Sequence, residues 1–143
     1  MVDAARLRAL LDRLAEIEAG LRRLRDLGRS AVGEDVDRLN SLKYLFVLAA
    51  EVAIDIGQHV IATEGLRAPD TFAGVFDELG RGGWISEEVA GSLGAMARFR
   101  NLLVHGYADV DDGRVVEVLH GSSLDELAAF RQAIAQRITP PRS

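Results

Sequence analysis

Apolar residues near the N-terminus recur with the spacing of an amphipathic helix. They step three and four residues apart, which places them along one narrow seam: Leu7, Leu10, Leu14, Ile17, Leu21 and Leu24. Gly28 and Gly33 end the pattern. We interpret the seam as core packing within a bundle, because an independent coiled coil normally needs roughly three or more heptads.

The segment from Asp35 to Glu64 contains no proline and is apolar around most of a helical circumference. This composition predicts the central, most buried helix of the fold. One side of the helix is polar instead and carries Tyr44, Glu51, Asp55, Gln58 and His59. Such a stripe faces solvent, an interface or a site, and solvent is the commonest of the three for a central helix.

A loop from Gly65 to Asp70 separates this helix from a short one that we expect from about Thr71 to Leu79. The short helix presents Phe72, Val75, Phe76 and Leu79 on its apolar side. Three glycines, at positions 80, 82 and 83, then indicate a tight turn between helices. They do not form a phosphate cradle, because no strand precedes them.

Two further long helices complete the pattern. The first is capped by Ser86, follows Trp84 and Ile85, and runs toward Gly106. The last opens with the capping box Ser123-Leu-Asp-Glu126 and is ended by prolines 140 and 141. Between them, the apolar residues 115–119 fit a short strand or a helical turn, and we favour the turn. The sequence therefore predicts a single all-α domain over residues 1–143, an antiparallel up-and-down bundle of four main helices with shorter accessory helices.

Composition removes several classes of function. The 143 residues are enough for one core, and the absence of cysteine excludes disulfides, thiolate metal sites and cysteine nucleophiles. The single lysine, Lys43, lies in no glycine-rich loop, which excludes a phosphate-binding P-loop. The net charge of −5 and the pI of about 5.2 are unlike those of duplex-coating proteins, so we expect no DNA partner.

The sequence also bears on location. Charged residues interrupt the apolar ones from Asp3 onward, so no signal peptide is predicted. The longest apolar run, Tyr44 to Ala50, is stopped by Glu51 and is far shorter than the ~20 residues of a membrane helix. We expect a cytoplasmic protein that does not span a membrane.

The candidate chemistry is concentrated between residues 98 and 107. Arg100 lies on the apolar stripe of its helix, where a guanidinium needs a partner: a carboxylate of the polar stripe or the phosphate of a ligand. Asn101 and His105 lie one turn apart on the adjacent face, which also carries the small residues 90, 94 and 97 and so allows another backbone to approach closely. With Tyr107, these residues supply a phosphate clamp, an orienting amide, a group that titrates near neutral pH and a phenol. Structural ion pairing and helix capping are the alternative roles.

Arg100, His105 and Tyr107 form an Arg-x4-His-x-Tyr motif. Together with Asn101, the upstream segment 51–59 and the turn at 84–86, this motif makes almost the whole chain resemble the HEPN superfamily. The resemblance is specifically to the HepT-like toxins of HEPN/minimal-nucleotidyltransferase toxin–antitoxin pairs.

The resemblance implies a homodimer whose two motifs meet in a shared cleft and act as a metal-independent endoribonuclease. His105 would transfer protons while the ribose 2′-OH attacks the adjacent phosphate, Arg100 would stabilise the developing charge, and Asn101 would hold the histidine or the phosphate. RNA is the implied substrate, because DNA lacks the internal nucleophile. Tyr107 would be adenylylated by the nucleotidyltransferase antitoxin.

Two alternatives stay open. Asp55 either pairs with Arg100 and supports the cleft or faces solvent, and the Glu51, Asp55 and His59 spacing is more typical of a wet helix face than of a metal site. We therefore expect neither a metal nor a cofactor. The alternative to an endoribonuclease is a non-catalytic helical partner, which acts as a binding subunit of a nucleotidyltransferase.

Overall fold

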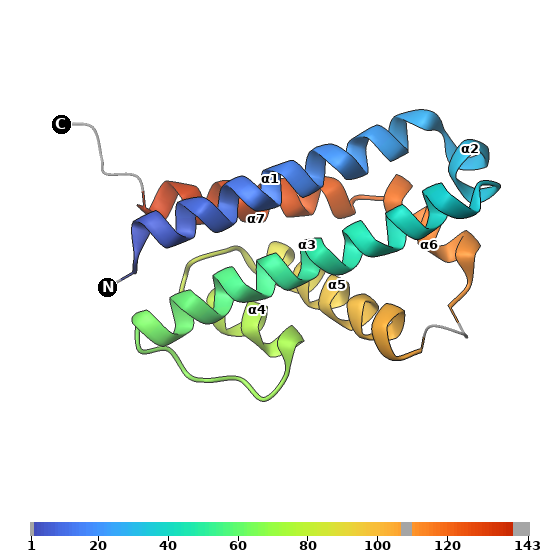
Figure 1. Ribbon diagram of the computed structural model, residues 1–143. Helices are drawn as coiled ribbons and strands as arrows, with labels where there is room; N and C mark the ends of the chain where they lie inside the picture. Colours follow the sequence, from blue (N-terminus) through green and yellow to red (C-terminus); the bar gives the residue numbers. More distant parts are fainter. Residues whose placement is uncertain (1, 107–109, 139–143) are drawn as a thin grey trace.

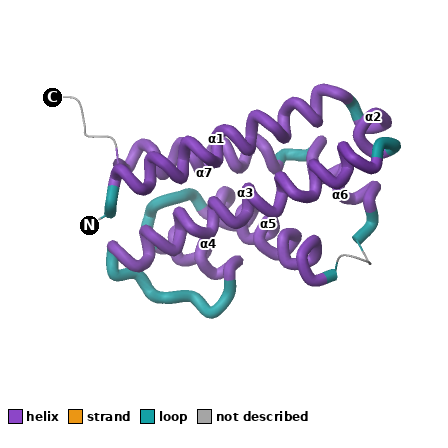
Figure 2. The backbone as a smooth tube through the Cα atoms, in the orientation of Figure 1, coloured by secondary structure: helices purple, strands orange, loops and turns teal. Residues whose placement is uncertain are grey.

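A computed structural model of the chain describes residues 2–106 and 110–138, and these residues form helices and no strand (Figures 1 and 2). In order, the helices are α1 (Ala4–Leu27), α2 (Arg29–Gly33), α3 (Val36–Thr63), α4 (Phe72–Arg81), α5 (Glu87–His105), α6 (Asp112–His120) and α7 (Ser123–Ile138). The predicted all-α class is confirmed. Four helices are long and three are short, and the segment at 115–119 is helical as favoured. Tyr107 and prolines 140 and 141 lie outside the described residues.

Polar side chains at the helix starts explain where the elements begin. Asp35 accepts a hydrogen bond from the Asp37 amide at 2.9 Å, and Ser86 accepts one from the Val89 amide at 3.1 Å. The predicted capping box of the last helix is misplaced by one residue. Ser123 is already helical. The first helical hydrogen bond runs from the Glu126 amide to the carbonyl oxygen of Ser122 at 2.9 Å.

Helix α3 is the centre of the bundle, as its composition predicts. Figure 1 shows α1 and α7 together on one side of α3, α4 and α5 on the other, and α2 and α6 at one end. The apolar side chains of α3 are buried against these neighbours, and the ring of Phe46 meets that of Phe99 on α5 edge to face at a centroid separation of 6.0 Å. By length and composition α3 could cross a membrane, but 56% of its most apolar window is buried inside the bundle.

Small residues let α4 approach both of its neighbours. A Cβ atom on Gly57 of α3 would collide with Val75 of α4, and one on Gly94 of α5 would lie 3.8 Å from the carbonyl oxygen of Ala73. The small-residue face of α5 is thus confirmed as a place of close helix packing. This packing fixes the start of α4 beside α5, so that Phe72 at the start of α4 lies over Arg100 in the second half of α5.

One ion pair in the fold is strongly buried. Glu18 of α1 is 3% exposed, and its Oε2 atom lies 2.8 Å from Nε of Arg131 on α7. Nη2 of Arg131 donates to the other carboxylate oxygen at 3.4 Å, so the contact is bidentate. The pair fixes α7 against α1.

Replacement of Arg131 by alanine is expected to lower the free energy of unfolding by about 3 kcal/mol, because it leaves the Glu18 carboxylate buried and unpaired. Urea denaturation measures this loss, with Gln132→Ala, an exposed neighbour, as the control. The double variant Glu18→Leu/Arg131→Leu should recover most of the stability. Equal stability of Arg131→Ala and the wild type would contradict the assigned role of the pair.

Candidate functional site at the end of helix α5

The Arg100 guanidinium points away from solvent, toward α3 and α4. Its Nη2 atom lies 3.0 Å from Oε1 of Glu51, and its Nη1 atom donates to Oδ1 of Asn101 at 3.1 Å. Its central carbon lies 5.5 Å from the centroid of the Phe72 ring, a cation–π distance. The side chain is only 16% exposed. Of the two partners that the sequence left open for Arg100, a carboxylate of the polar stripe or a ligand phosphate, the structure shows the first, on α3.

These contacts do not use all the hydrogen-bonding capacity of Arg100. A guanidinium carries five N–H donors. The hydrogen bonds to Glu51 and Asn101 use two of them, and within residues 2–106 and 110–138 the buried Nε atom has no hydrogen-bond partner. The N–H groups that Glu51 and Asn101 leave unused are the donors that an oxyanion bound at this guanidinium would engage.

His105 is the last residue of α5 and is exposed. It lines a broad, open hollow together with Arg98, Asn101, Leu102 and Gly106. Arg100 does not line this hollow, because five residues of helix turn it about 140° away from His105. Within one chain, the imidazole and the guanidinium therefore do not face each other.

Asn101 connects the two environments. Its carbonyl oxygen accepts from Arg100, and its side chain lines the His105 hollow. In the described residues, the hydrogen bond of this amide is to the arginine and not to the imidazole that it was expected to orient.

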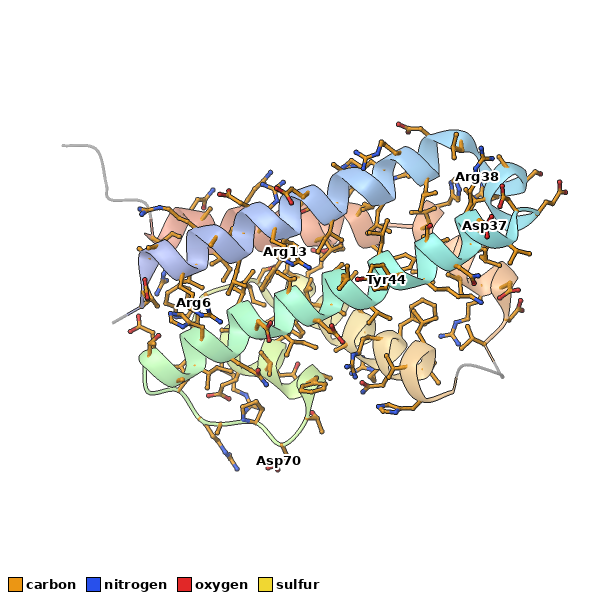
Figure 3. All side chains as sticks on the ribbon, viewed as in Figure 1. Arg6, Arg13, Asp37, Arg38, Tyr44 and Asp70 are labelled. Atoms are coloured by element: carbon orange, nitrogen blue, oxygen red, sulfur yellow. The ribbon has the colours of Figure 1, made fainter. Side chains whose placement is uncertain are left out.

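The polar stripe of α3 is not a single surface. The partner of Arg100 is Glu51 and not Asp55, which lies one turn further along and is exposed. The choice depends on how α3 and α5 cross, which the spacing along α3 alone does not contain. Figure 3 shows Tyr44 on the outer side of α3, and its side chain is 63% exposed. A role of Asp55 in a shared cleft stays a prediction.

The chain matches a known family model. The family model described as Ribonuclease HepT-like matches residues 10–134. The chain belongs to this family. A search of curated proteins finds no match.

Solved structures support the HepT-like fold. A tri-AMPylated Shewanella oneidensis HEPN toxin in complex with an MNT antitoxin is 20% identical, with a TM-score of 0.84 over 95% of this chain and 99% of that chain. A cytosolic protein of unknown function from Bacillus subtilis, YutE, is also 20% identical, with a TM-score of 0.81 over 96% of this chain and 91% of that one. A toxin–antitoxin structure with AMP-PNP is 22% identical, with a TM-score of 0.78 over 89% and 97% of the two chains.

The described part of this HepT-like chain contains no group of three His, Asp or Glu side chains placed to hold a metal ion. Nε2 of His59 instead accepts a hydrogen bond from the backbone amide of Asp3 at 3.1 Å. That contact ties the start of α1 to α3, so at least one member of the Glu51, Asp55 and His59 series has a structural role.

Two residues were missed or misjudged from the sequence. Phe72 was assigned to the apolar side of α4, but it is 39% exposed and lies over Arg100. His120 was not singled out from the sequence, yet its Nε2 atom is buried and has no hydrogen-bond partner among the described residues. Partial burial, reinforced by the charges of Arg29 and Arg25, lowers the pKa of His120. The sequence pattern around Phe72 and His120 does not predict these surroundings, because the contacting residues come from segments distant in the sequence.

Proposed function

We propose that this HepT-like chain is the toxin of a toxin–antitoxin pair and acts as a metal-independent endoribonuclease. One observation carries the proposal: Asn101 joins a mostly buried guanidinium with unused donors to the open hollow lined by His105. A phosphate clamp, an amide and a titratable imidazole thus come from a single helix end. The family description, Ribonuclease HepT-like, supports the same reaction class.

The active unit we propose is a homodimer. Since Arg100 and His105 of one chain point about 140° apart, a second copy is needed to bring an imidazole to each guanidinium. The end of α5 has the exposed apolar side chains for such a contact, since Leu102 is 44% exposed and Val104 is 42% exposed. Asp55, exposed on α3, would lie at the rim of the shared cleft and support it.

In the proposed reaction, the ribose 2′-oxygen attacks the adjacent phosphorus and the bond to the 5′-oxygen of the next nucleotide breaks. His105 transfers the proton that leaves the 2′-OH or the one that the 5′-oxygen gains. Arg100 stabilises the extra negative charge on the phosphoryl oxygens, and Asn101 holds the phosphate or the histidine. The products are a 2′,3′-cyclic phosphate and a 5′-hydroxyl, and DNA is not cut because it lacks the 2′-OH.

The proposed partner is a minimal nucleotidyltransferase antitoxin. One structural neighbour is a tri-AMPylated HEPN toxin in complex with an MNT antitoxin. We assign Tyr107, which follows α5 in sequence, as the residue that receives AMP. An added phosphate close to His105 would repel the RNA backbone. We place the pair in the cytoplasm, in line with the cytosolic neighbour from Bacillus subtilis.

A second candidate function has its own support. The Arg100–Glu51 ion pair is also what a purely structural arginine would show. The chain would then be a non-catalytic helical subunit that binds a nucleotidyltransferase, with no turnover of RNA.

The deciding experiment is cleavage of a fluorescent RNA oligonucleotide by the purified protein in EDTA. We expect cleavage to continue without divalent metal and mass spectrometry to identify a 2′,3′-cyclic phosphate. A single 2′-deoxy substitution at the cleaved nucleotide should stop cleavage there, because it removes the nucleophile while keeping the charge. Intact RNA, or cleavage that survives the 2′-deoxy substitution, would exclude the proposed reaction.

A further inference from the structure

A cavity of about 420 Å³ lies between the end of α3 and the loop that leads into α4. Its walls include Gln58 and Ile61 of α3, Leu66, Pro69 and Asp70 of the loop, and Phe72 of α4. The loop is fixed to α4, since the Arg67 amide donates to Oε1 of Glu78 at 3.3 Å and the Thr71 hydroxyl caps the helix at the Gly74 amide at 3.0 Å. The loop wall of the cavity is therefore held in place by hydrogen bonds with α4.

The walls of the cavity suit a flat, uncharged group. The residues that line it include no arginine, lysine or histidine, and they include one carboxylate, that of Asp70. A phosphate would be repelled by that carboxylate and would find no compensating cation. Apolar surface from Ile61, Leu66 and Pro69, with polar groups only from a few side chains, is the usual composition of a pocket for a small organic ring.

Phe72 connects the cavity to the candidate site. Its ring lines the cavity and also lies 5.5 Å from the guanidinium carbon of Arg100. The side chain keeps 39% of its surface exposed, although it is the first residue of α4. The Phe72 ring is therefore shared between the cavity, which it lines, and the surroundings of the Arg100 guanidinium, which lies over it.

We propose that this cavity is a nucleobase subsite of the nuclease. It would hold the base of a nucleotide adjacent to the phosphate bound at Arg100, stacked on Phe72, with Gln58 and Asp70 at the polar edge of the base. The identity of the ligand as RNA rests on the proposed function. A cavity without cationic side chains, separated from the Arg100 guanidinium by the Phe72 ring, matches the two parts of a nucleotide: a neutral base to stack and a phosphate to bind.

The carboxylate of Asp70 gives the subsite a preference. An ionised carboxylate only accepts hydrogen bonds, so it favours bases that present an amino group, namely adenine, cytosine and guanine, over uracil. Figure 3 shows Asp70 in the loop between α3 and α4, and its side chain is exposed.

The test pairs a change in the protein with a change in the RNA. The substrate is an oligonucleotide in which the nucleotide on one side of the cleaved bond is replaced by an abasic unit, and each side is tested in turn. We expect the wild type to lose about tenfold or more in kcat/KM for one abasic position, the usual size of a base–aromatic stacking contact. Phe72→Leu should show a similar loss of kcat/KM on intact RNA, and its kcat/KM should not fall further when the RNA carries that abasic unit. Phe72→Trp, which keeps a stacking surface, should restore both the rate and the sensitivity.

This design separates a base contact from a positioning effect on Arg100. If Phe72 only holds the guanidinium, Phe72→Leu lowers cleavage of intact and abasic RNA by the same factor, and the subsite is excluded. Leu27→Ala, which removes an exposed apolar side chain at the far end of α1, is the matched control and should behave as the wild type.

A binding measurement keeps the two proposals distinguishable. A dinucleotide with a 2′-deoxy linkage cannot be cut, and its affinity is measured by calorimetry for wild type, Phe72→Leu and Asp70→Asn. Weaker binding to Phe72→Leu with no RNA cleavage by the wild type would refute the nuclease and keep the subsite. Equal binding to wild type and Phe72→Leu would refute the subsite even where RNA is cut. Equally tight binding of free adenosine monophosphate would make the cavity a free-nucleotide site and overturn the assignment to RNA.

Discussion

Replacing His105 with alanine is expected to lower RNA cleavage by about 10²- to 10⁴-fold, the range that a positioned proton-transfer group contributes. The fold should not change. His105 is the exposed last residue of α5, and its side chain lies at a surface hollow and not in the core. A large loss of rate with unchanged thermal unfolding would therefore assign the effect to chemistry.

The measurement is single-turnover cleavage of a fluorescent RNA, with oligomeric state checked on the same samples. His59→Gln is the matched control, because His59 is a half-buried histidine of α3 that accepts a hydrogen bond from the Asp3 backbone at the start of α1. The control should cleave at close to the wild-type rate. A His105→Ala protein that remains folded and keeps most of its rate would remove the imidazole from the mechanism and favour the binding-subunit alternative.

The helices could be predicted because their signals are local. The leucine seam, the apolar run from Asp35 to Glu64 and the Ser86 cap each act within a few turns of their own chain, and the structure places α1, α3 and α5 accordingly. The predicted start of α7 was wrong by one residue, because local sequence signals do not fix a helix end to a single position. Two consecutive serines offer the same chemistry, and only the backbone geometry decides between them.

The candidate site could be predicted only in part, because its partners come from different helices. Periodicity placed Arg100 on a burying face, where it needs a partner, either a carboxylate of the polar stripe or a ligand phosphate. It did not say which turn of α3 would supply that anion, and Glu51 does so instead of Asp55. The position of Phe72 over Arg100 depends on the close packing of α4 against Gly57 and Gly94, which no pattern within α4 reveals.

Arg100→Ala is expected to lower cleavage by about 10²- to 10³-fold, the usual loss when a group that stabilises an oxyanion is removed. Arg100→Lys should recover little of this. A lysine keeps the positive charge but lacks the planar fork that contacts Glu51 and Asn101 together. The cost in stability should be small in comparison, because the Glu51 side chain left behind is 44% exposed and can be hydrated. Chemical denaturation of the three proteins beside their cleavage rates provides the comparison.

Mixing the two inactive variants tests where the site is assembled. In one chain Arg100 and His105 point about 140° apart, so each guanidinium should work with the imidazole of the other copy. A mixed dimer of Arg100→Ala and His105→Ala then keeps one intact pair, and an equal mixture should regain about a quarter of wild-type activity after subunit exchange. If each chain used its own pair, no combination would contain an intact site and the mixture would stay inactive. The mixing experiment therefore decides between a shared site and two separate ones, whatever the substrate RNA.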